Sequence, residues 1–535
     1  MNKTGPWITI VVAMMAVVCA ILYCLPATPA APAAPAAAQA SPGAIGIFEG
    51  RTDIGEVVHP GVAEYDAASK TYTLTAAGEN MWSTKDAFYF LRTQVSGDVE
   101  LSADVAFPHQ GGRPHRKAAL VLKQNLDADG VYADAALHGS GLPALQYRRA
   151  KGATTEDIEL NIDMPQRARI VKRGDEITMF LSMHGEPLHQ AGASIKLHFD
   201  GPFYAGIGLC SHNKDATETA VFSNVELKKP DAETAANLVL FSALQTIQTE
   251  DNFRRSMMVR TGMGRIGSAN WTKDGQTLYF DREGQIEKMP VLGATPESVK
   301  IGPHLWCDDN HGLSPDNKLL AVSCAPTKGP ATSIYVVSLD GAGNRRVAHG
   351  GTVEFHGWSP DATTIAFTAT RHGHRDIYTV TVVGGAETRL TITGANDGPD
   401  FGPDGAIYFN SDRSGAMQIW RMNADGTYAE QLTHDDTNDW FPHVSSDGKQ
   451  MVYLTCARSI AGQPANSDVS LRVMDLFSAR SRVLADLFGG QGTINSPSWS
   501  PDNHHLAFTG YEMLPASADG PDFVMVAPRP DTPPK

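Results

Sequence analysis

Short apolar runs and tight polar turns alternate regularly through the C-terminal half of the chain. A short phrase recurs there six times, beginning at Trp271, Leu313, Trp358, Phe401, Val444 and Trp499, and the fourth residue of each copy is Asp. These Asp residues stand at 274, 316, 361, 404, 447 and 502, so the gaps are 42, 45, 43, 43 and 55 residues. A period of this length with strand-like units is typical of a β-propeller. The pattern predicts six blades over residues 256–527, followed by a Pro-rich tail at 528–535.

Each predicted blade should contain four strands. In the third repeat, the alternation of apolar and polar residues predicts strands at 352–359, 364–369, 376–382 and near 387–390. The last repeat is short by one strand, whereas an additional apolar run at 257–260 precedes the first repeat. We expect that run to pair into the sixth blade and close the ring, because closure removes exposed sheet edges.

Residues 45–229 lack the repeat but also alternate apolar and polar positions. Such runs occur at 71–74, 88–91, 99–105, 118–122, 168–172 and 177–181, with Gly, Asp and Pro between them. A period of two predicts antiparallel strands with one buried face, and about a dozen of these would form a two-sheet sandwich of jelly-roll type. Residues 230–255 are then a linker. The predicted fold class is all-β, with a β-sandwich before a six-bladed propeller.

The first 40 residues have the composition of a targeting segment. Lys3 provides a positive charge, residues 7–25 are apolar, and Ala38-Gln39-Ala40 in the Pro/Ala-rich stretch that follows matches a signal-cleavage site. The apolar run is also long enough to cross a bilayer. Both a cleaved signal peptide and a retained inner-membrane anchor predict an exported protein of the periplasm or cell envelope.

Charge and cysteine usage narrow the classes of partner. The formal net charge is −15, and no basic stripe occurs along the chain, which argues against nucleic acid as a partner. Cys307 and Cys324 flank one of the predicted turns at nearly equal distances, so they should face each other across neighbouring strands. They are either a disulfide, which an exported protein can form, or two buried thiols.

The repeats resemble the TolB-like propeller family. The resemblance rests on the Ser-Pro-Asp turns, on Asn410-Ser411-Asp412-Arg413, and on Ile419-Trp420-Arg421-Met422-Asn423-Ala424-Asp425-Gly426. It covers about residues 264–527 and implies the six-bladed fold rather than an activity. Residues 45–229 resemble concanavalin-like domains that accompany such propellers in exported bacterial proteins. The founding periplasmic protein of the family carries a different N-terminal domain, so its envelope role does not transfer directly.

Candidate site residues come from an alignment of the six repeats on their Asp. Five positions before it stand His311 and His356, and seven positions before it stand Asp309, Glu354, Asp397 and Trp440. A strand period of two would place these on the same face as the apolar residue that begins each phrase, at the mouth of the central channel. Further polar residues crowd the same rim: Asn310, Asp400, Asn438, Asp439 and His443.

The rim can be interpreted in several ways. His311, His356 and Asp309 could bind a divalent metal, since imidazole and carboxylate suit zinc, manganese or iron. His311, His356 and Glu354 could act as acid and base on a sugar, as in propeller lyases such as oligogalacturonate lyase, which the chain resembles in fold only. Trp440 with the rim carboxylates and amides could bind a carbohydrate or a cell-envelope protein without catalysis. Asn, Asp and His also commonly cap their own backbone, which would fit an envelope scaffold.

The predicted sandwich offers a second candidate region. Asp127 and Asp129 lie in one turn, and Arg148 and Arg149 follow on a later strand. Acidic loops can hold calcium, but this turn lacks the downstream Glu of a helix-loop-helix site. The two arginines point to opposite faces of a strand, so they cannot share one groove.

Overall fold

The computed structural model describes residues 43–109, 111–160, 165–182, 188–191, 194–231, 238–250, 255–262, 264–302, 305–515 and 523–524. These ranges contain strands and turns, which agrees with the predicted all-β class. The contacts between residues divide the chain into two compact units, residues 1–43 and residues 44–535, and the second unit contains the strands. The predicted targeting segment lies outside the described residues. Within the described ranges, no helix has the length and apolarity that crossing a membrane requires.

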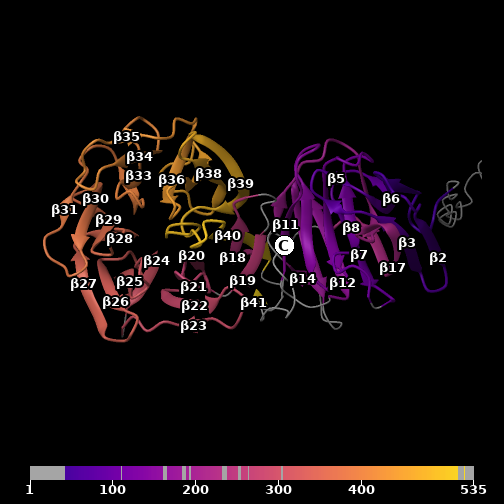
Figure 1. The fold of residues 1–535 in the computed structure, drawn as a ribbon, viewed down its shortest axis with the longest axis horizontal. Coiled ribbons are helices and arrows are strands. Elements are labelled where there is room, and N and C mark those ends of the chain that lie inside the picture. The colour runs from indigo at the N-terminus through magenta and orange to yellow at the C-terminus, as the bar shows by residue number, and fades with distance from the viewer. Residues whose placement is uncertain are drawn as a thin grey trace, which may run out of the picture. The chain divides into compact units, whose positions relative to one another are not determined.

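Five four-stranded antiparallel sheets follow one another along the C-terminal half and form the blades of a β-propeller (Figure 1). The first and second are β20 (Ile266–Trp271), β21 (Thr277–Arg282), β22 (Gln285–Pro290), β23 (Glu297–Ser298), and β24 (Trp306–Leu313), β25 (Leu319–Ala325), β26 (Ser333–Ser338), β27 (Gly343–His349). The third and fourth are β28 (Thr352–Trp358), β29 (Thr364–Arg371), β30 (His374–Thr381), β31 (Thr388–Arg389), and β32 (Asn396–Phe401), β33 (Ile407–Ser411), β34 (Gln418–Met422), β35 (Glu430–Gln431). The fifth is β36 (Thr437–Val444), β37 (Gln450–Ala457), β38 (Ser467–Asp475) and β39 (Arg480–Gly489). The four strands predicted for the third repeat are therefore confirmed.

The recurring phrase forms the turn between the first and second strand of each blade. In the second blade, Ser314 Oγ donates to Asp316 Oδ1 at 2.7 Å, and Asp316 Oδ1 accepts from the Lys318 amide at 3.2 Å. These bonds lower the pKa of Asp316 to about 2. The same Ser and Asp pattern closes the turns at Asp361 and Asp447. The phrase is thus a local turn held by its own side chains, which explains its recurrence.

The apolar residue that begins the phrase joins neighbouring blades. Trp358 Nε1 donates to the carbonyl of Gly312 at 2.8 Å, and Trp499 Nε1 donates to the carbonyl of His443 at 2.9 Å. The indoles therefore bond to the inner strand of the preceding blade, as expected for a wedge between blades.

The sixth repeat differs from the other five. Its inner segment forms an isolated bridge between Trp499 and Leu506, and its next strand, β40 (His505–Pro515), pairs along its whole length with β18 (Leu238–Gln248). β18 also pairs with β19 (Arg255–Thr261), which contains the run 257–260, and β41 (Phe523–Val524) pairs with β19. The structure shows five four-stranded blades, so the predicted sixth blade of four strands is not found in that form.

These strands continue a large sheet of the N-terminal part, because β19 pairs in parallel with β11 (Glu156–Glu159). The rest of that sheet, in spatial order before β11, is β1 (Gly50–Ile54), β6 (Phe88–Val95), β16 (Phe203–Cys210), β8 (Lys117–Lys123), β9 (Tyr132–His138) and β10 (Pro143–Arg148). The second sheet, in spatial order, is β14 (His189–Gln190), β13 (Glu176–Ser182), β12 (Arg167–Arg173), β7 (Val99–Ala106), β17 (Asn213–Lys228), β3 (Thr71–Gly78) and β2 (Val62–Asp66), with β15 (Ile195–Lys196) on β13. β4 (Met81–Trp82) and β5 (Lys85–Asp86) form a separate hairpin.

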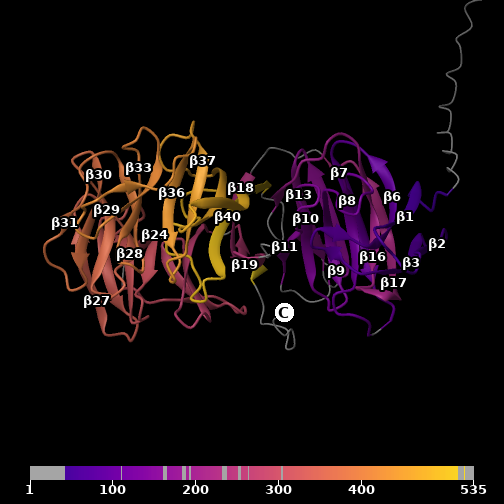
Figure 2. The same cartoon turned by 45° about the horizontal axis from the view of Figure 1, so that its top comes forward.

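The strands of the two N-terminal sheets can be followed in Figure 2, and one hydrophobic core joins the two sheets. It includes Leu101 and Ile170 of the smaller sheet and Leu120, Leu145 and Ile207 of the larger one, all fully buried. Alternate residues of each strand thus meet between the sheets, which is the arrangement that a period of two predicts.

Candidate functional site

A β-bulge interrupts the inner strand of every four-stranded blade just before the phrase. In β28, Phe355 pairs with Phe367 and Gly357 with Ala366, so one additional residue lies between them. β20, β24, β32 and β36 have register shifts at the same place. A bulge changes the face to which the residues before it point. The prediction that an uninterrupted period of two places all the rim residues on one face is therefore wrong.

Residues 494–496 of the sixth repeat are buried among the inner strands of other blades. The carbonyl of Ile494 lies 2.6 Å from Nε2 of His443, and the carbonyl of Asn495 lies 3.4 Å from Nδ1 of His356. Two of the predicted rim histidines therefore face a backbone segment of the chain itself.

His311 on β24 is fully buried. Its Nε2 lies 3.3 Å from the carbonyl of Tyr279, and its Nδ1 has no hydrogen-bond partner among the described residues. Burial lowers the pKa of His311 to about 4, although the Tyr279 carbonyl opposes this shift. The imidazole is thus neutral near physiological pH.

Glu354 on β28 and Asp397 on β32 share one cation, Arg375 of β30. Arg375 Nη2 donates to Asp397 Oδ1 at 2.8 Å and also to Glu354 Oε2. His356 Nε2 lies 3.4 Å from the same Asp397 oxygen, a contact outside hydrogen-bond geometry. Burial raises the pKa of Asp397, but Arg375 and His356 outweigh it and hold that pKa well below its usual range. The structure thus brings together three predicted residues, Glu354, His356 and Asp397, around an arginine that the sequence did not single out.

A cavity of about 470 Å³ adjoins this group, between the third, fourth and fifth blades. Its lining includes Arg375, Asp397, Asn438, Trp440, Arg458 and Gln463. Gln463, in the loop between β37 and β38, donates from Nε2 to Asp397 Oδ2. Arg375 Nε is buried and has no partner among the described residues.

Two predicted residues of β36, Asn438 and Trp440, line this cavity, and the predicted Asp439 stands between them in the strand. Asn438 accepts from the Met417 amide at 3.2 Å and donates to the Ile460 carbonyl at 3.1 Å. Burial raises the pKa of Asp439 to about 6, against hydrogen bonds from threonine hydroxyls. Trp440 lines the cavity but is only 3% exposed, so most of its ring is covered by protein. An open stacking surface is therefore not available on Trp440.

The remaining predicted residues lie elsewhere on the inner strands. Asp400 Oδ2 is 3.0 Å from Nδ1 of His443, which connects the fourth and fifth blades. Asn310 on β24 donates from Nδ2 to Asp308 Oδ1 at 3.2 Å. Asp309, the next-door residue, faces a separate cavity of about 270 Å³ between the first and second blades.

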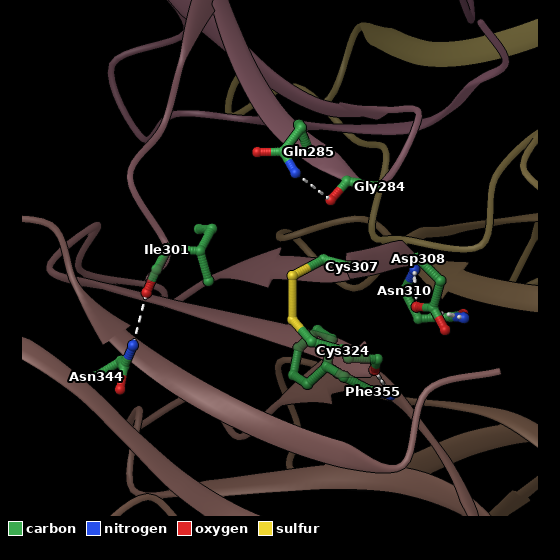
Figure 3. The surroundings of a disulfide bond; sticks show 10 residues. Gly284, Gln285, Ile301, Cys307, Asp308, Asn310, Cys324, Asn344 and Phe355 are labelled. Atoms are coloured by element: carbon green, nitrogen blue, oxygen red, sulfur yellow. Dashed lines mark hydrogen bonds between the residues drawn. A yellow bond between two sulfur atoms is a disulfide. The ribbon is translucent and has the colours of Figure 1, made fainter. Parts of the chain in front are cut away.

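The disulfide between Cys307 and Cys324 links β24 to β25 beside that second cavity (Figure 3). Cys307 pairs directly with Cys324 in the ladder, as their distances from the turn predict. Of the two states that the sequence left open, the structure has the bonded one. Asp308 and Asn310 follow Cys307 on the same strand, and both are labelled in Figure 3.

Comparison with known proteins agrees with this architecture. The family model described as the TolB beta propeller domain matches residues 313–512. An uncharacterised Agrobacterium fabrum protein is 40% identical over 245 residues, which are 45% of this chain and 83% of that protein. The chain belongs to the TolB-like β-propeller family.

More distant relatives carry the TolB name. The Tol-Pal system protein TolB of Francisella tularensis is 25% identical over 265 residues, or 48% of this chain, and this chain spans 59% of its length. A solved Agrobacterium tumefaciens structure described as a TolB is 36% identical, with a TM-score of 0.48 over 51% of this chain and 99% of that one.

The residues of this TolB-like propeller do not form a ready site for a divalent metal at Arg375. Among the described residues, one group of three His, Cys, Asp or Glu side chains has ligand atoms within 4.8 Å of one another: Glu354, His356 and Asp397. Arg375 already bonds to both carboxylates, and its positive charge would repel a metal ion. The predicted set of His311, His356 and Asp309 is not such a group, and its metal remains a prediction.

The second candidate region, before the TolB-like propeller, is held by ion pairs. Lys151 Nζ lies 2.6 Å from Asp127 and 3.6 Å from Asp129, so a lysine occupies the acidic turn. Arg148 is fully buried and donates to both oxygens of Asp86. Arg149 points to Glu156 instead, in line with the opposite faces expected for the two arginines.

Sequence reasoning missed several residues that line the propeller cavities, among them Arg375, Arg265 and Asp281. All three lie outside the inner strands, so an alignment read backwards from the phrase does not include them. A charged residue inside an otherwise apolar strand, such as Asp281 after Tyr279 and Phe280, is a signal that could have found one of them.

Proposed function

We propose that this TolB-like propeller protein is exported and binds a small carbohydrate in the cavity between the third, fourth and fifth blades. One observation carries the proposal: Arg375, Asp397, Asn438 and Gln463 converge from three blades on one cavity of about 470 Å³. Carboxylate oxygens accept hydrogen bonds from sugar hydroxyls, guanidinium groups donate to them, and amides do both. The volume lies within the range of small-molecule sites, about 300–1,000 Å³.

Export is supported by two features. The apolar stretch at 7–25 with its A-x-A-like site has the pattern of a signal peptide. The disulfide between Cys307 and Cys324 is of a kind that persists in oxidising compartments. The intact mass of the protein purified from its host cells would show whether the N-terminal segment is cleaved as a signal peptide or retained as an inner-membrane anchor. A full-length, untranslocated chain with reduced Cys307 and Cys324 would contradict export.

The binding test uses calorimetric titration with a panel of neutral and uronate mono- and oligosaccharides. Gln463→Ala should weaken binding about tenfold, because it removes an amide that lines the cavity and that donates to Asp397. Gln431→Ala is the matched control, since Gln431 lies on β35, the outer strand of the fourth blade, and donates to the carbonyl of Thr433. Absence of any sugar binding, or equal loss in both variants, would contradict the proposal.

The same panel addresses the alternative functions. Mass spectrometry of the sugars after incubation would reveal smaller products if the protein is a lyase or glycoside hydrolase. A His311→Ala/His356→Ala variant should then lose product formation. A cell-envelope protein is the other partner class, in keeping with the Tol-Pal name of the Francisella relative. Unchanged sugars together with no binding would favour that class or a scaffold.

We also propose that β40, β18 and β19 act as a sixth blade that closes the ring, and that residues 45–229 are a concanavalin-like sandwich. Strands from before and after the five blades pair over the full length of β40, from Leu238 with Pro515 to Gln248 with His505. Such pairing supports closure by both ends of the repeat region. A chain that ends before β40 should then lose cooperative unfolding of the propeller, measured by circular dichroism, and retained cooperativity would contradict closure.

A further inference from the structure

The cavity of about 270 Å³ between the first two blades shares no lining residue with the proposed carbohydrate site. Its walls are formed by β20, β21, β24 and the segments next to them. The lining consists of Arg265, Gly267, Asp281, Glu283, Gly284, Trp306, Cys307, Asp308, Asp309 and Lys328. A volume of this size holds several waters or a small organic ion, since one water takes about 30 Å³.

Four carboxylates line this cavity, those of Asp281, Glu283, Asp308 and Asp309, and the guanidinium of Arg265 accompanies them. Arg265 donates to the carbonyl of Gln491 and lies 4.7 Å from the ring centre of Tyr511, so part of its bonding is directed elsewhere. At the rim, Glu283 and Lys328 neutralise each other at 3.2 Å. The interior of the cavity is therefore short of positive charge.

Asp281 shows this shortage most directly. Asp281 is only 7% exposed, and its Oδ1 has no hydrogen-bond partner among the described residues. A buried carboxylate oxygen without a partner is costly unless a ligand or ion completes its bonding. Burial raises the pKa of Asp281, and Asp309 raises it further. The pKa of Asp308 is raised by burial and then by Asp309 and Glu354.

Gly267 keeps the space between the carboxylates open. A Cβ at this position would lie 2.1 Å from Asp281 Oδ1 and 2.6 Å from Asp309 Cβ. A side chain would therefore fill the gap that separates the two acids. The gap between Asp281 and Asp309 therefore depends on the missing side chain of Gly267.

The aromatic wall indicates which cation fits. The ammonium of Lys328 lies 4.8 Å from the ring centre of Trp306, so the indole face already accepts an ammonium of this chain. A divalent metal fits less well, because Asp281, Asp308 and Asp309 are not among the described groups whose ligand atoms converge within 4.8 Å. A primary amine needs only two or three acceptors at hydrogen-bond distance, and it can lie against the ring.

We propose that the cavity lined by Asp281, Asp308, Asp309 and Trp306 is a second ligand site, which binds a primary ammonium group. The ammonium donates to the carboxylates of Asp281 and Asp309, and its carbon chain lies along the indole of Trp306. The source of the group is either a free amine or a lysine side chain of another protein. The site is independent of the carbohydrate proposal, because the two cavities have no residue in common.

The test is calorimetric titration of the full protein at low salt and about pH 8, because carboxylates with raised pKa values ionise at higher pH than usual while amines stay protonated. One arm uses cadaverine as a free amine, and the other uses Nα-acetyl-lysine N-methylamide as a lysine side chain. Binding in either arm supports the shared chemistry and identifies its source. Asp281→Asn and Asp309→Asn should each weaken binding at least about tenfold, since a charge-assisted bond is lost.

Asp274→Asn is the matched control, because Asp274 lies in the turn of the same first blade and bonds to Thr272 instead of the cavity. It should leave amine affinity unchanged. Circular dichroism melts of all three variants verify folding, and Gly267→Ala provides a steric variant that keeps every charge. The proposal is overturned if neither amine binds up to about 10 mM. It is also overturned if Asp281→Asn binds normally, or if calcium or manganese binds there and excludes cadaverine.

Discussion

Buried carboxylates occupy two places in this propeller, and the cations beside them differ. At the third and fourth blades, Arg375 donates to both Glu354 and Asp397, and the pKa of Asp397 is lowered. At the first and second blades, burial and mutual repulsion raise the pKa of Asp281 and Asp308. Similar side chains thus share hydrogen bonds from one arginine in one place, whereas in the other Asp281 Oδ1 has no hydrogen-bond partner among the described residues.

The comparison teaches how to separate a structural ion pair from a candidate ligand site. A carboxylate whose bonds are complete contributes stability and leaves little for a ligand. A carboxylate whose bonds are incomplete costs stability in the free protein, and a ligand of opposite charge can recover that cost. A carboxylate in a cavity with a perturbed pKa and incomplete hydrogen bonds is therefore a better indication of a ligand site than a carboxylate whose bonds are complete.

The largest effect on stability should come from removing Arg375 from the cluster that it forms with Glu354 and Asp397. Arg375→Met leaves Glu354 and Asp397 buried without their cation, which should lower the free energy of unfolding by about 3–5 kcal/mol in urea titrations at neutral pH. Arg421→Met is the control, since Arg421 pairs with two exposed carboxylates and should cost less than about 1 kcal/mol. Equal losses in the two variants would mean that the Arg375 cluster is no more than a surface pair.

The second prediction concerns acid. His311 is fully buried with a pKa of about 4, below the ordinary 6.5, so its unfolded form takes up a proton first as pH falls. The buried neutral imidazole contributes its full stability above about pH 6.5. As pH falls from there toward 4, the free energy of unfolding decreases by about 3 kcal/mol. His311→Gln should lack this loss in urea titrations across that range.

Asp439 provides a control of opposite sign for the acid experiment. Its pKa is raised to about 6, so its ionisation costs stability as pH rises from about 4 to 6. Asp439→Asn should therefore gain stability relative to wild type as pH rises. A His311→Gln variant that follows the wild-type pH profile would contradict a buried neutral imidazole.

The third prediction sharpens the comparison with one substitution at two sites. Asp397→Asn should destabilise by about 2 kcal/mol at neutral pH, because it loses a charge-assisted bond from Arg375. Asp281→Asn should stabilise the folded protein by about 1 kcal/mol, because it removes a buried carboxylate whose Oδ1 lacks a hydrogen-bond partner among the described residues. Urea midpoints at neutral and acidic pH provide the measurement, and the gain from Asp281→Asn should disappear in acid. The same sign at both sites would refute the distinction.

The smallest effect concerns the rim of the second cavity. Lys328 is largely exposed, and its ammonium lies over Trp306. Lys328→Ala should free the ring and raise cadaverine affinity about two- to fivefold, the scale of an exposed cation–π contact. Calorimetry measures this directly. A weaker affinity would instead show that Lys328 does not compete with the bound amine.

Much of the fold could be predicted from the sequence because it depends on local interactions. The phrase at Ser314 and Asp316 closes its own turn, and its period marks where each blade begins. The strands of the third repeat and the facing of Cys307 and Cys324 follow from the same local register. The sixth repeat could not be predicted in this way, since its strands pair with β18 and β19 from before the first blade.

The candidate sites divide in the same manner. Glu354, His356 and Asp397, all of them candidates from the repeat alignment, lie near one another, because consecutive blades repeat the same strand. The alignment could not include Arg375, which enters from β30, and it assumed an unbroken period of two where each inner strand has a bulge.

The sequence by itself thus determined the all-β class, the blade period and the residues of the inner strands. Each of these depends on hydrogen bonds between residues a few positions apart. Only the tertiary structure decided that the carbonyls of Ile494 and Asn495 meet His443 and His356, and that Arg375 bonds to both Glu354 and Asp397. It also decided that Oδ1 of Asp281 remains without a hydrogen-bond partner among the described residues. Burial and charge neutralisation depend on residues far apart in the chain, and no local pattern encodes which of them meet.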